Sequence, residues 1–303
     1  MSILGTPLVA DLAARTLDRL AVIRPPAAAR FAEIPGRTEH LSIPTRHGPM
    51  AATLYLPPDG SGRAQGVYVN SHGGGFVISH PEQDDPWCRY LAANAEVAVL
   101  NVDYVVAPRK RFPAPVEQVY DAVTWAAQER ERWDGSRLAV GGQSAGGSIS
   151  AGVARLALET PGSPRIALQV LHYAVLDLVT PLGERRSALK RPLLTPWLGE
   201  IFNNAYIPIH GVRTDRLASP CWSNNADGLE GISPALVVTC EYDRLHDEGA
   251  RFAQTLEKTG ALREHIDVEG VDHGYNLFAK TRQPTEDVYR RITQHVVDAF
   301  SDR

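Results

Sequence analysis

The sequence predicts an α/β protein with a mostly parallel central sheet flanked by helices and a small helical cap. Short apolar runs typical of buried strands alternate with longer stretches of helical periodicity through most of the chain. A glycine cluster follows one apolar run and a glycine-framed serine follows a later one. Prolines and aromatic residues interrupt the alternation between residues 181 and 219. A chain of 303 residues can bury one large core of this kind.

Residues 1–40 are expected to form the N-terminal part of the cap. Within this segment, residues 7–23 place apolar side chains at helical spacing, which predicts an amphipathic helix. These side chains are Val9, Ala13, Leu17 and Leu20. Their stripe must cover something apolar, and the pattern leaves two alternatives open: a lid over a site, or the contact of a homodimer.

The core is expected in two parts, residues 41–180 and 220–303. An antiparallel pair of strands between residues 41 and 56 opens it, because Pro44, Gly48 and Pro57 punctuate short alternating runs. The following strands are expected at 67–70, 97–102, 138–141, 166–171, 236–240 and 265–268. The helices between and after them are expected at 83–95, 115–133, 145–158, 247–259 and 285–300.

Residues 181–219 are expected to be a cap insertion, because long insertions in compact domains are usually lids or binding loops. Three aromatic residues of this segment, Trp197, Phe202 and Tyr206, are candidates for lining a substrate pocket. Aromatic side chains in a proline-rich insertion are also typical of simple packing, and the sequence leaves both interpretations open.

The composition narrows the choice of partners. The chain carries 31 basic and 35 acidic side chains, a net charge of −4, without a long run of either sign. This balance argues against nucleic acid or an anionic membrane as a partner and suits a small, weakly charged substrate. Charged residues such as Asp11 and Arg15 interrupt the N-terminal apolar stretch before any signal-peptide core or membrane span.

Three cysteines, Cys88, Cys221 and Cys240, are widely spaced, odd in number and without paired metal-ligand spacing. Neither a disulfide framework nor a zinc site is therefore expected. We expect a cytoplasmic protein that uses no metal and no cofactor.

The most informative motif is Gly-Gln-Ser-Ala-Gly at residues 142–146. It fits the pentapeptide in which a strand turns sharply into a helix and exposes the hydroxyl of a serine, here Ser144. Gly142 and Gly146 permit the turn and close helix packing, and Ala145 would offer its backbone N–H to an oxyanion. The alternative is a small residue in a tight turn without chemistry, and a second motif argues against it.

That second motif is His-Gly-Gly-Gly at residues 72–75, directly after an apolar run. Unshielded backbone N–H groups can point at one oxygen where side chains do not block the approach, so Gly73 and Gly74 are the expected oxyanion donors. His72 and Gly75 are expected to shape the loop, and His72 is not expected to be the base. Either motif alone would be weak, but the ordered pair predicts an acyl-transfer site.

A serine hydroxyl needs an imidazole to accept its proton and a carboxylate to orient that imidazole. His273 follows the last expected strand, between Gly270 and Gly274, where this chain order places the base. The alternative for His273 is an ordinary histidine of a surface loop.

Asp243 follows the late apolar run that ends at Cys240 and is the preferred carboxylate. Asp247 and Glu248 are alternatives, although acids there are typical of a helix start. Asp272 is a further alternative, but two adjacent side chains rarely converge on one another.

These motifs resemble those of the bacterial hormone-sensitive-lipase-like carboxylesterases, a family of the α/β-hydrolase superfamily. The similarity spans most of the chain and includes the His-Gly-Gly-Gly loop and the serine pentapeptide extended by Gly147. It also includes Asp-Tyr-Val-Val-Ala-Pro at 103–108, Phe-Pro-Ala-Pro at 112–115 and the acidic segment at 241–249. The resemblance implies an α/β-hydrolase fold, Asp243 as the orienting acid, and a cap of N-terminal helices and a mid-chain insertion over an acyl pocket.

Three residues depart from the pattern of this family. Gln143 stands before the serine, where an acid or a small hydroxyl residue is usual. Arg109 replaces a common glutamate, and Arg244 replaces a common proline after the acid. None of them removes a residue of the expected triad, but they indicate altered contacts around it.

The sequence thus predicts a serine carboxylesterase that hydrolyses short- to medium-chain acyl esters of small molecules through an acyl-enzyme. An amide or lactone hydrolase with the same triad is an alternative. A ligand-binding receptor on a disabled hydrolase is a further alternative, and such a protein is expected to lose a triad member. Long-chain lipase activity is less expected, because no strongly amphipathic membrane-seeking surface is evident.

Overall fold

The computed structural model describes residues 6–21, 23–58, 63–278 and 281–301. Parts of the expected segments lie outside the described residues. These parts are residues 1–5 of the N-terminal segment, residue 22 of the expected first helix, and residues 302–303 of the second part of the core. The strands are β1 (Arg37–Ile43), β2 (Met50–Leu56), β3 (Val67–Ser71), β4 (Ala98–Asp103), β5 (Leu138–Gln143), β6 (Leu168–His172), β7 (Ala235–Cys240) and β8 (Leu262–Val268). The α-helices are α1 (Pro7–Leu20), α2 (Asp85–Ala95), α3 (Ala114–Ala126), α4 (Ala145–Glu159), α5 (Pro196–Tyr206), α6 (His246–Lys258), α7 (Tyr275–Phe278) and α8 (Gln283–Ser301). Short 3₁₀ helices span Ala27–Ala29, Pro81–Asp84, Leu182–Glu184, His210–Thr214 and Ser223–Ala226.

All eight strands belong to one sheet with the order β1-β2-β4-β3-β5-β6-β7-β8. β2 pairs antiparallel with β1 and β4, and every other neighbouring pair is parallel. The expected opening antiparallel pair and the parallel strands after it are confirmed. Because β3, β5, β7 and β8 run in one direction, the loops after their carboxyl ends meet at one edge of the sheet.

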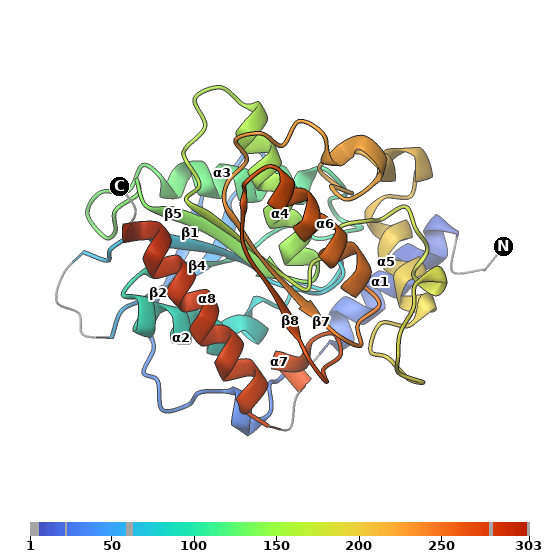
Figure 1. Cartoon of the computed structure of the whole chain (residues 1–303), viewed down its shortest axis with the longest axis horizontal. Coiled ribbons are helices and arrows are strands. Elements are labelled where there is room, and N and C mark those ends of the chain that lie inside the picture. Colours follow the sequence, from blue (N-terminus) through green and yellow to red (C-terminus); the bar gives the residue numbers. More distant parts are fainter. Residues whose placement is uncertain (1–5, 22, 59–62, 279–280, 302–303) are drawn as a thin grey trace.

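Helices cover both faces of the sheet (Figure 1). α2 and α8 pack against one another on one face, while α3, α4 and α6 cover the other. β3, β5, β6 and β7 are buried along their whole lengths. This burial explains their continuous apolar runs, because a parallel strand between two helical layers has no face in water.

One expected helix, at residues 115–133, ends earlier than its pattern predicts, at Ala126. The Glu129 carboxylate accepts the backbone N–H groups of Arg130 and Glu131 at 2.9 and 2.8 Å, which replaces helical hydrogen bonds. The apolar residue that extended the pattern, Trp133, is buried in a separate position and donates its Nε1–H to the Ala126 carbonyl at 2.9 Å. The prediction was wrong here because a buried aromatic residue kept the helical spacing beyond the helix end.

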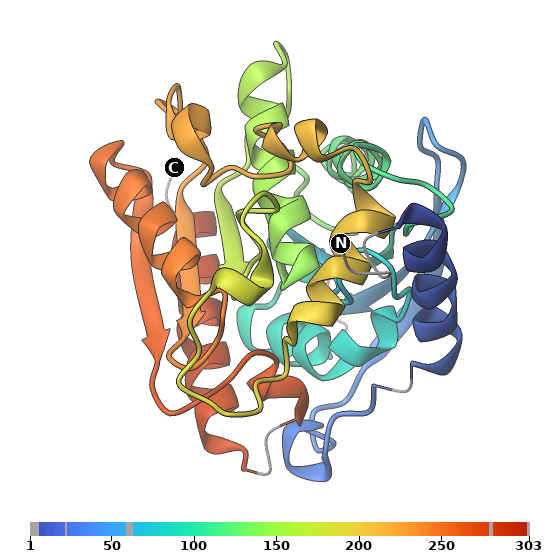
Figure 2. The ribbon, with the colours of Figure 1, turned by 90° about the vertical axis from the view of Figure 1, so that its right-hand side faces the viewer.

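α1 and α5, far apart in the sequence, lie side by side (Figure 2). Arg111 joins them, because its guanidinium donates to the Asp11 carboxylate at 2.7 Å and to the Ala205 carbonyl at 2.6 Å. The segment at residues 181–219 contains α5 and two 3₁₀ turns. The N-terminal helix and the mid-chain segment therefore form one contiguous layer at this end of the molecule.

Candidate active site

Ser144 stands at the turn between β5 and α4 with φ 55° and ψ −120°. A residue other than glycine with positive φ is strained by roughly 1–3 kcal/mol, and such strain is typical of functional sites. The Ser144 N–H donates to the His172 carbonyl at 2.9 Å, which helps to hold the turn.

The two glycines of the pentapeptide are required by the backbone of β3. A Cβ atom at either Gly142 or Gly146 would collide with the carbonyl oxygen of Ser71. The absence of both side chains lets the turn and the first residues of α4 lie directly against the end of β3. The loop that follows β3 is thereby brought beside Ser144.

Ser144, His273 and Asp243 form a hydrogen-bonded chain at the carboxyl edge of the sheet. The Nδ1 atom of His273 lies 2.6 Å from Asp243 Oδ2, and its Nε2 atom lies 2.9 Å from Ser144 Oγ. Because the carboxylate accepts the Nδ1 proton, Nε2 is left to accept the serine proton. The three residues are only 9%, 7% and 3% exposed, in the order Ser144, His273, Asp243. The second Asp243 oxygen accepts the Leu245 N–H at 3.0 Å, which fixes the carboxylate.

The other acids considered for the site point elsewhere. Asp247 is exposed and contacts His246, while Asp272 accepts the backbone N–H of Leu193 at 2.7 Å. Glu248 is buried, but it forms a charge pair with Arg185. Among the candidate carboxylates, the structure therefore brings Asp243 to the imidazole of His273.

The glycine loop after β3 lies against Ser144. A Cβ atom built on Gly73 would lie 3.6 Å from the Ser144 Cβ, which is ordinary contact distance. Gly74 and Gly75 have φ values of 125° and 59°, in the region that favours glycine. Within the described part of the chain, the N–H groups of Gly73 and Gly74 have no acceptor. Ala145 opens α4, so its N–H also lacks a helical partner.

His72 braces this loop. Its Nδ1 atom lies 2.7 Å from the Gly73 carbonyl oxygen, and its ring stacks on Tyr104 at 4.3 Å. The Tyr104 hydroxyl donates to the His72 carbonyl at 2.7 Å. Burial lowers the pKa of His72, so the ring stays neutral. These contacts place His72 in the support of the loop, and no hydrogen bond joins it to Ser144 in the described structure.

A second histidine near the site, His172, is also kept neutral. Burial, together with the nearby His273, lowers the pKa of His172 to about 3. Its Nε2 atom lies 3.0 Å from the Tyr275 hydroxyl. His172 therefore does not compete with His273 for the serine proton.

One functional candidate, Asp84, was not predicted from the sequence. Its carboxyl is buried and lies within hydrogen-bond reach of the side-chain amides of Gln143 and Asn70. The Gln143 carbonyl oxygen accepts the Asn276 amide at 2.7 Å and also contacts the Tyr173 hydroxyl. Gln143, at the position where the family pattern has an acid or a small hydroxyl residue, is thus paired with an acid from a different segment. Nothing in the acidic run around Asp84 signals this contact.

Burial raises the pKa of Asp84 to about 7, although the amides of Asn70 and Gln143 pull it down. No ion pair of Asp84 occurs among the described residues. The group is therefore poised to change charge near neutral pH.

A cavity of about 40 Å³ opens beside Ser144. Its lining includes Gly75, Val175, Leu182, Leu194, Phe202 and Leu245. Of the three aromatic candidates, Phe202 lines this cavity and packs so closely on Gly75 that a Cβ there would collide with its ring. Tyr206 instead stacks on Phe76 at 4.0 Å, and Trp197 is about half exposed. Neither of these two lines the cavity.

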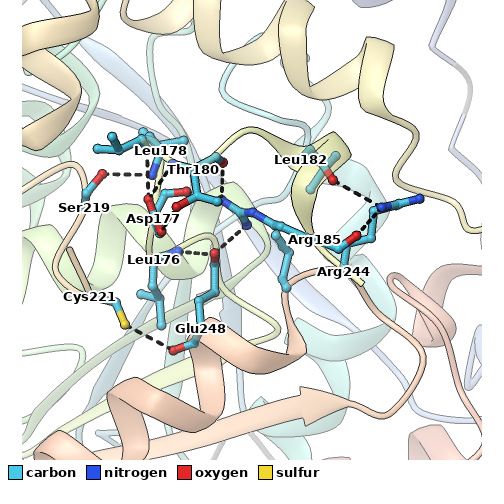
Figure 3. Close-up of polar contacts among 12 residues, drawn as sticks. Leu176, Asp177, Leu178, Thr180, Leu182, Arg185, Ser219, Cys221, Arg244 and Glu248 are labelled. Carbon is cyan, nitrogen blue, oxygen red and sulfur yellow. Dashed lines mark hydrogen bonds and ion pairs between the residues drawn. The ribbon is translucent and has the colours of Figure 1, made fainter. Parts of the chain in front are cut away.

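A buried charge pair supports the wall of this cavity (Figure 3). Arg185 contacts the Glu248 carboxylate, which also accepts the Leu176 N–H at 2.7 Å. Burial raises the pKa of Glu248 to about 8, although the neighbouring Arg185 pulls it down. Arg244 donates to the carbonyls of Leu182 and Arg185, the first at 3.2 Å. The unusual arginine after Asp243 therefore ties the loop of the acid to the wall of the cavity.

Among the described residues, no group of three or more histidine, cysteine or acidic side chains is arranged to hold a metal ion. Searching the helices of the described ranges likewise finds none with the length and apolar character needed to cross a membrane.

Comparison with known proteins agrees with this architecture. Residues 68–277 match the family model of the alpha/beta hydrolase fold. The esterase LipI of Mycobacterium tuberculosis is 32% identical over 252 residues, which cover 80% of this chain and 76% of that protein. An ethyl acetate hydrolase of Pseudomonas putida is 33% identical over 278 residues, with 88% and 83% covered. The solved structure of an esterase from Pyrobaculum calidifontis superposes with a TM-score of 0.79 at 30% identity, covering 98% of this chain and 93% of that one.

The chain therefore belongs to the α/β-hydrolase superfamily and, within it, to the hormone-sensitive-lipase-like carboxylesterase family. The expected family and fold class are confirmed.

Proposed function

We propose that this protein is a serine carboxylesterase that hydrolyses short- to medium-chain acyl esters through an acyl-enzyme intermediate. The observation that carries the proposal is the hydrogen-bonded chain from Asp243 through His273 to Ser144, next to unpaired backbone N–H groups. A hydroxyl with a base, an orienting acid and oxyanion donors is the constellation that acyl transfer requires.

In the first half of the reaction, Ser144 Oγ attacks the ester carbonyl carbon while His273 Nε2 accepts the hydroxyl proton. The carbonyl oxygen becomes an oxyanion in a tetrahedral intermediate. When the intermediate collapses, the bond to the alcohol oxygen breaks and His273 returns the proton to that oxygen. The products are the free alcohol and an acyl group on Ser144.

In the second half, a water molecule donates a proton to His273 Nε2 and its oxygen attacks the acyl carbon. Collapse of this second intermediate returns the proton to Ser144 and releases the carboxylic acid. Throughout, Asp243 keeps the imidazole in the tautomer that leaves Nε2 free and stabilises the imidazolium that forms.

The oxyanion is assigned to the N–H groups of Gly73, Gly74 and Ala145. The glycine loop, whose backbone carries no side chains, and the first turn of α4 support this assignment, because both lie beside Ser144. Donors that are already oriented stabilise developing charge without reorganisation, and losing one costs on the order of 10²-fold to 10³-fold in kcat.

An ester rather than an amide or lactone is proposed as the substrate. The related proteins carry the names esterase and ethyl acetate hydrolase, which favours small esters over the alternatives. The complete set of Ser144, His273 and Asp243 disfavours the receptor alternative, which is expected to lose one of them.

We also propose that the N-terminal segment and residues 181–219 act as a cap over the core at 41–180 and 220–303. The packing of α1 on α5 and the position of Leu182 and Phe202 in the cavity wall support this division. A cytoplasmic location is proposed on the free thiols of all three cysteines.

The test is hydrolysis of p-nitrophenyl acetate and butyrate by purified protein. Ser144→Ala is expected to abolish turnover, whereas Ser148→Ala, one turn further along α4, is the matched control and should retain it. A fluorophosphonate probe should label the folded wild-type protein at Ser144. Equal rates for the wild type and Ser144→Ala would reject the assigned nucleophile.

A further inference from the structure

Two cavities lie on opposite sides of one thin wall. The cavity beside Ser144 has a volume of about 40 Å³, and a larger one of about 370 Å³ is lined mostly by residues of the 181–219 segment. Three residues, Leu182, Gly199 and Asn203, line both cavities. The cavities are therefore separated by residues of the 3₁₀ turn at Leu182–Glu184 and of the middle of α5, namely the side chains of Leu182 and Asn203 and the backbone of Gly199.

The chemistry of the reaction shows which part of an ester enters the smaller cavity. His273 must return its proton to the alcohol oxygen, so the alcohol group lies on the side of the imidazole. The lining of the cavity includes Ser144 and Gly75 but not His273. The smaller cavity therefore lies on the other side of the reacting carbon, where the acyl chain must extend.

The two charged side chains that line this cavity, Arg185 and Asp177, both have partners within the protein. Arg185 faces Glu248, and Asp177 accepts the N–H groups of Val179 and Thr180 at 2.9 and 3.0 Å. Most of the remaining surface is contributed by aliphatic and aromatic side chains. Such a cavity favours an uncharged hydrocarbon chain over a charged acyl group.

The wall between the cavities depends mainly on Leu182. Its side chain packs directly on the backbone of Gly199, where an added Cβ would lie 2.8 Å from Leu182 Cβ. Two contacts fix the position of Leu182 (Figure 3). Its carbonyl oxygen accepts a hydrogen bond from Arg244, and Arg185, three residues further along the chain, is held by Glu248. Removing the Leu182 side chain beyond Cβ would leave Gly199 with nothing to fill the gap.

We propose that Leu182 is the residue that limits acyl-chain length, as the partition between the short cavity beside Ser144 and the larger cavity within the 181–219 segment. This inference rests on the proposed esterase function. The smaller cavity has room for about three groups of the size of a water molecule, which corresponds to a butyryl chain beyond its carbonyl carbon. Longer chains reach the partition and stop there.

The test is a series of p-nitrophenyl esters from acetate to decanoate with the wild type and Leu182→Ala. The wild type is expected to peak near butyrate and decline sharply at octanoate. Each methylene group of the substrate that is buried among apolar side chains should raise kcat/KM about fourfold, equivalent to about 0.8 kcal/mol. Because part of the larger cavity is polar, the octanoate-to-acetate ratio of kcat/KM is expected to rise at least about tenfold in Leu182→Ala.

Leu193→Ala is the matched control, since Leu193 belongs to the same segment but lines neither cavity. It should keep the wild-type profile. Leu182→Val serves as a second variant if Leu182→Ala does not fold, and its ratio should shift in the same direction by a smaller factor.

A second series consists of acetate esters with alcohols of increasing length. It shows whether Leu182 limits the acyl part or the alcohol part of the ester. Leu182→Ala is expected to leave this series unchanged. An unchanged acyl profile in a folded, active Leu182 variant would overturn the proposal, as would a shift in the alcohol series alone. A wild type that hydrolyses none of the esters would instead contradict the esterase function itself.

Discussion

The side-chain amide of Gln143 donates a hydrogen bond to the buried carboxyl of Asp84, next to the turn that carries Ser144. Asn70 donates to the other carboxyl oxygen at 2.8 Å. Asp84 precedes α2, and Gln143 ends β5, so this contact joins a helix of one face to the strand beneath the nucleophile. Ionisation of a buried carboxyl is unfavourable when its partners are neutral amides and no cation lies beside it.

The stability of the wild type should therefore depend on pH through Asp84. Its pKa is about 7 in the folded protein against an ordinary value of 3.8, so the folded state binds more protons between these values. Stability contributed by the protonated group is present at low pH and is lost as pH rises through about 7, on the order of a few kcal/mol. Urea unfolding of the wild type and Asp84→Asn from pH 5 to 8 measures this loss.

Asp84→Asn keeps an uncharged amide at the position and should remove this component. The free energy of unfolding of the wild type should fall relative to that of Asp84→Asn as pH rises. Parallel pH curves for the two proteins would contradict the assigned titration.

Asp243→Asn should lower kcat by about 10⁴-fold, because an amide in place of the carboxylate favours the wrong imidazole tautomer. Asp247→Asn is the control: Asp247 is exposed, and its contact is with His246 rather than His273. Steady-state kinetics on p-nitrophenyl butyrate compare the two. If Asp247→Asn caused the large loss and Asp243→Asn did not, the assignment of the acid would be wrong.

Gly146→Ala should destabilise the protein by about 1–3 kcal/mol or prevent folding, because its Cβ would collide with the Ser71 carbonyl. Gly211→Ala is the matched control, since a Cβ there meets nothing within 4 Å. Its effect should stay within about 0.5 kcal/mol. Thermal or urea unfolding gives both values, and similar midpoints for the two variants would argue against the close contact.

Arg185→Met should destabilise the fold by up to about 3–5 kcal/mol above pH 8, where the buried Glu248 is ionised and the variant lacks the cation beside it. The double variant Arg185→Met/Glu248→Gln should recover part of this loss, since the uncompensated charge is then also removed. A double-mutant cycle by urea unfolding measures the coupling. Additive losses would show that the two side chains do not interact.

The local pattern was enough to predict much of this protein. Alternating apolar runs predicted the parallel strands, since a strand buried on both faces has to be apolar throughout. Glycines at 142 and 146 predicted the sharp turn, because a side chain there has no room. The early end of α3 could not be predicted in this way, since the spacing to Trp133 resembles a helix while the Glu129 side chain replaces its hydrogen bonds.

The sequence by itself determined the fold class and proposed which hydroxyl, imidazole and carboxylate should meet, because strand order places the loops after parallel strands at one edge. The tertiary structure decided the rest. The contact of Asp84 with Gln143, and the partition that Leu182 makes between two cavities, join segments distant in the chain. Such contacts depend on how layers pack on one another, and neither periodicity nor a local motif encodes that packing.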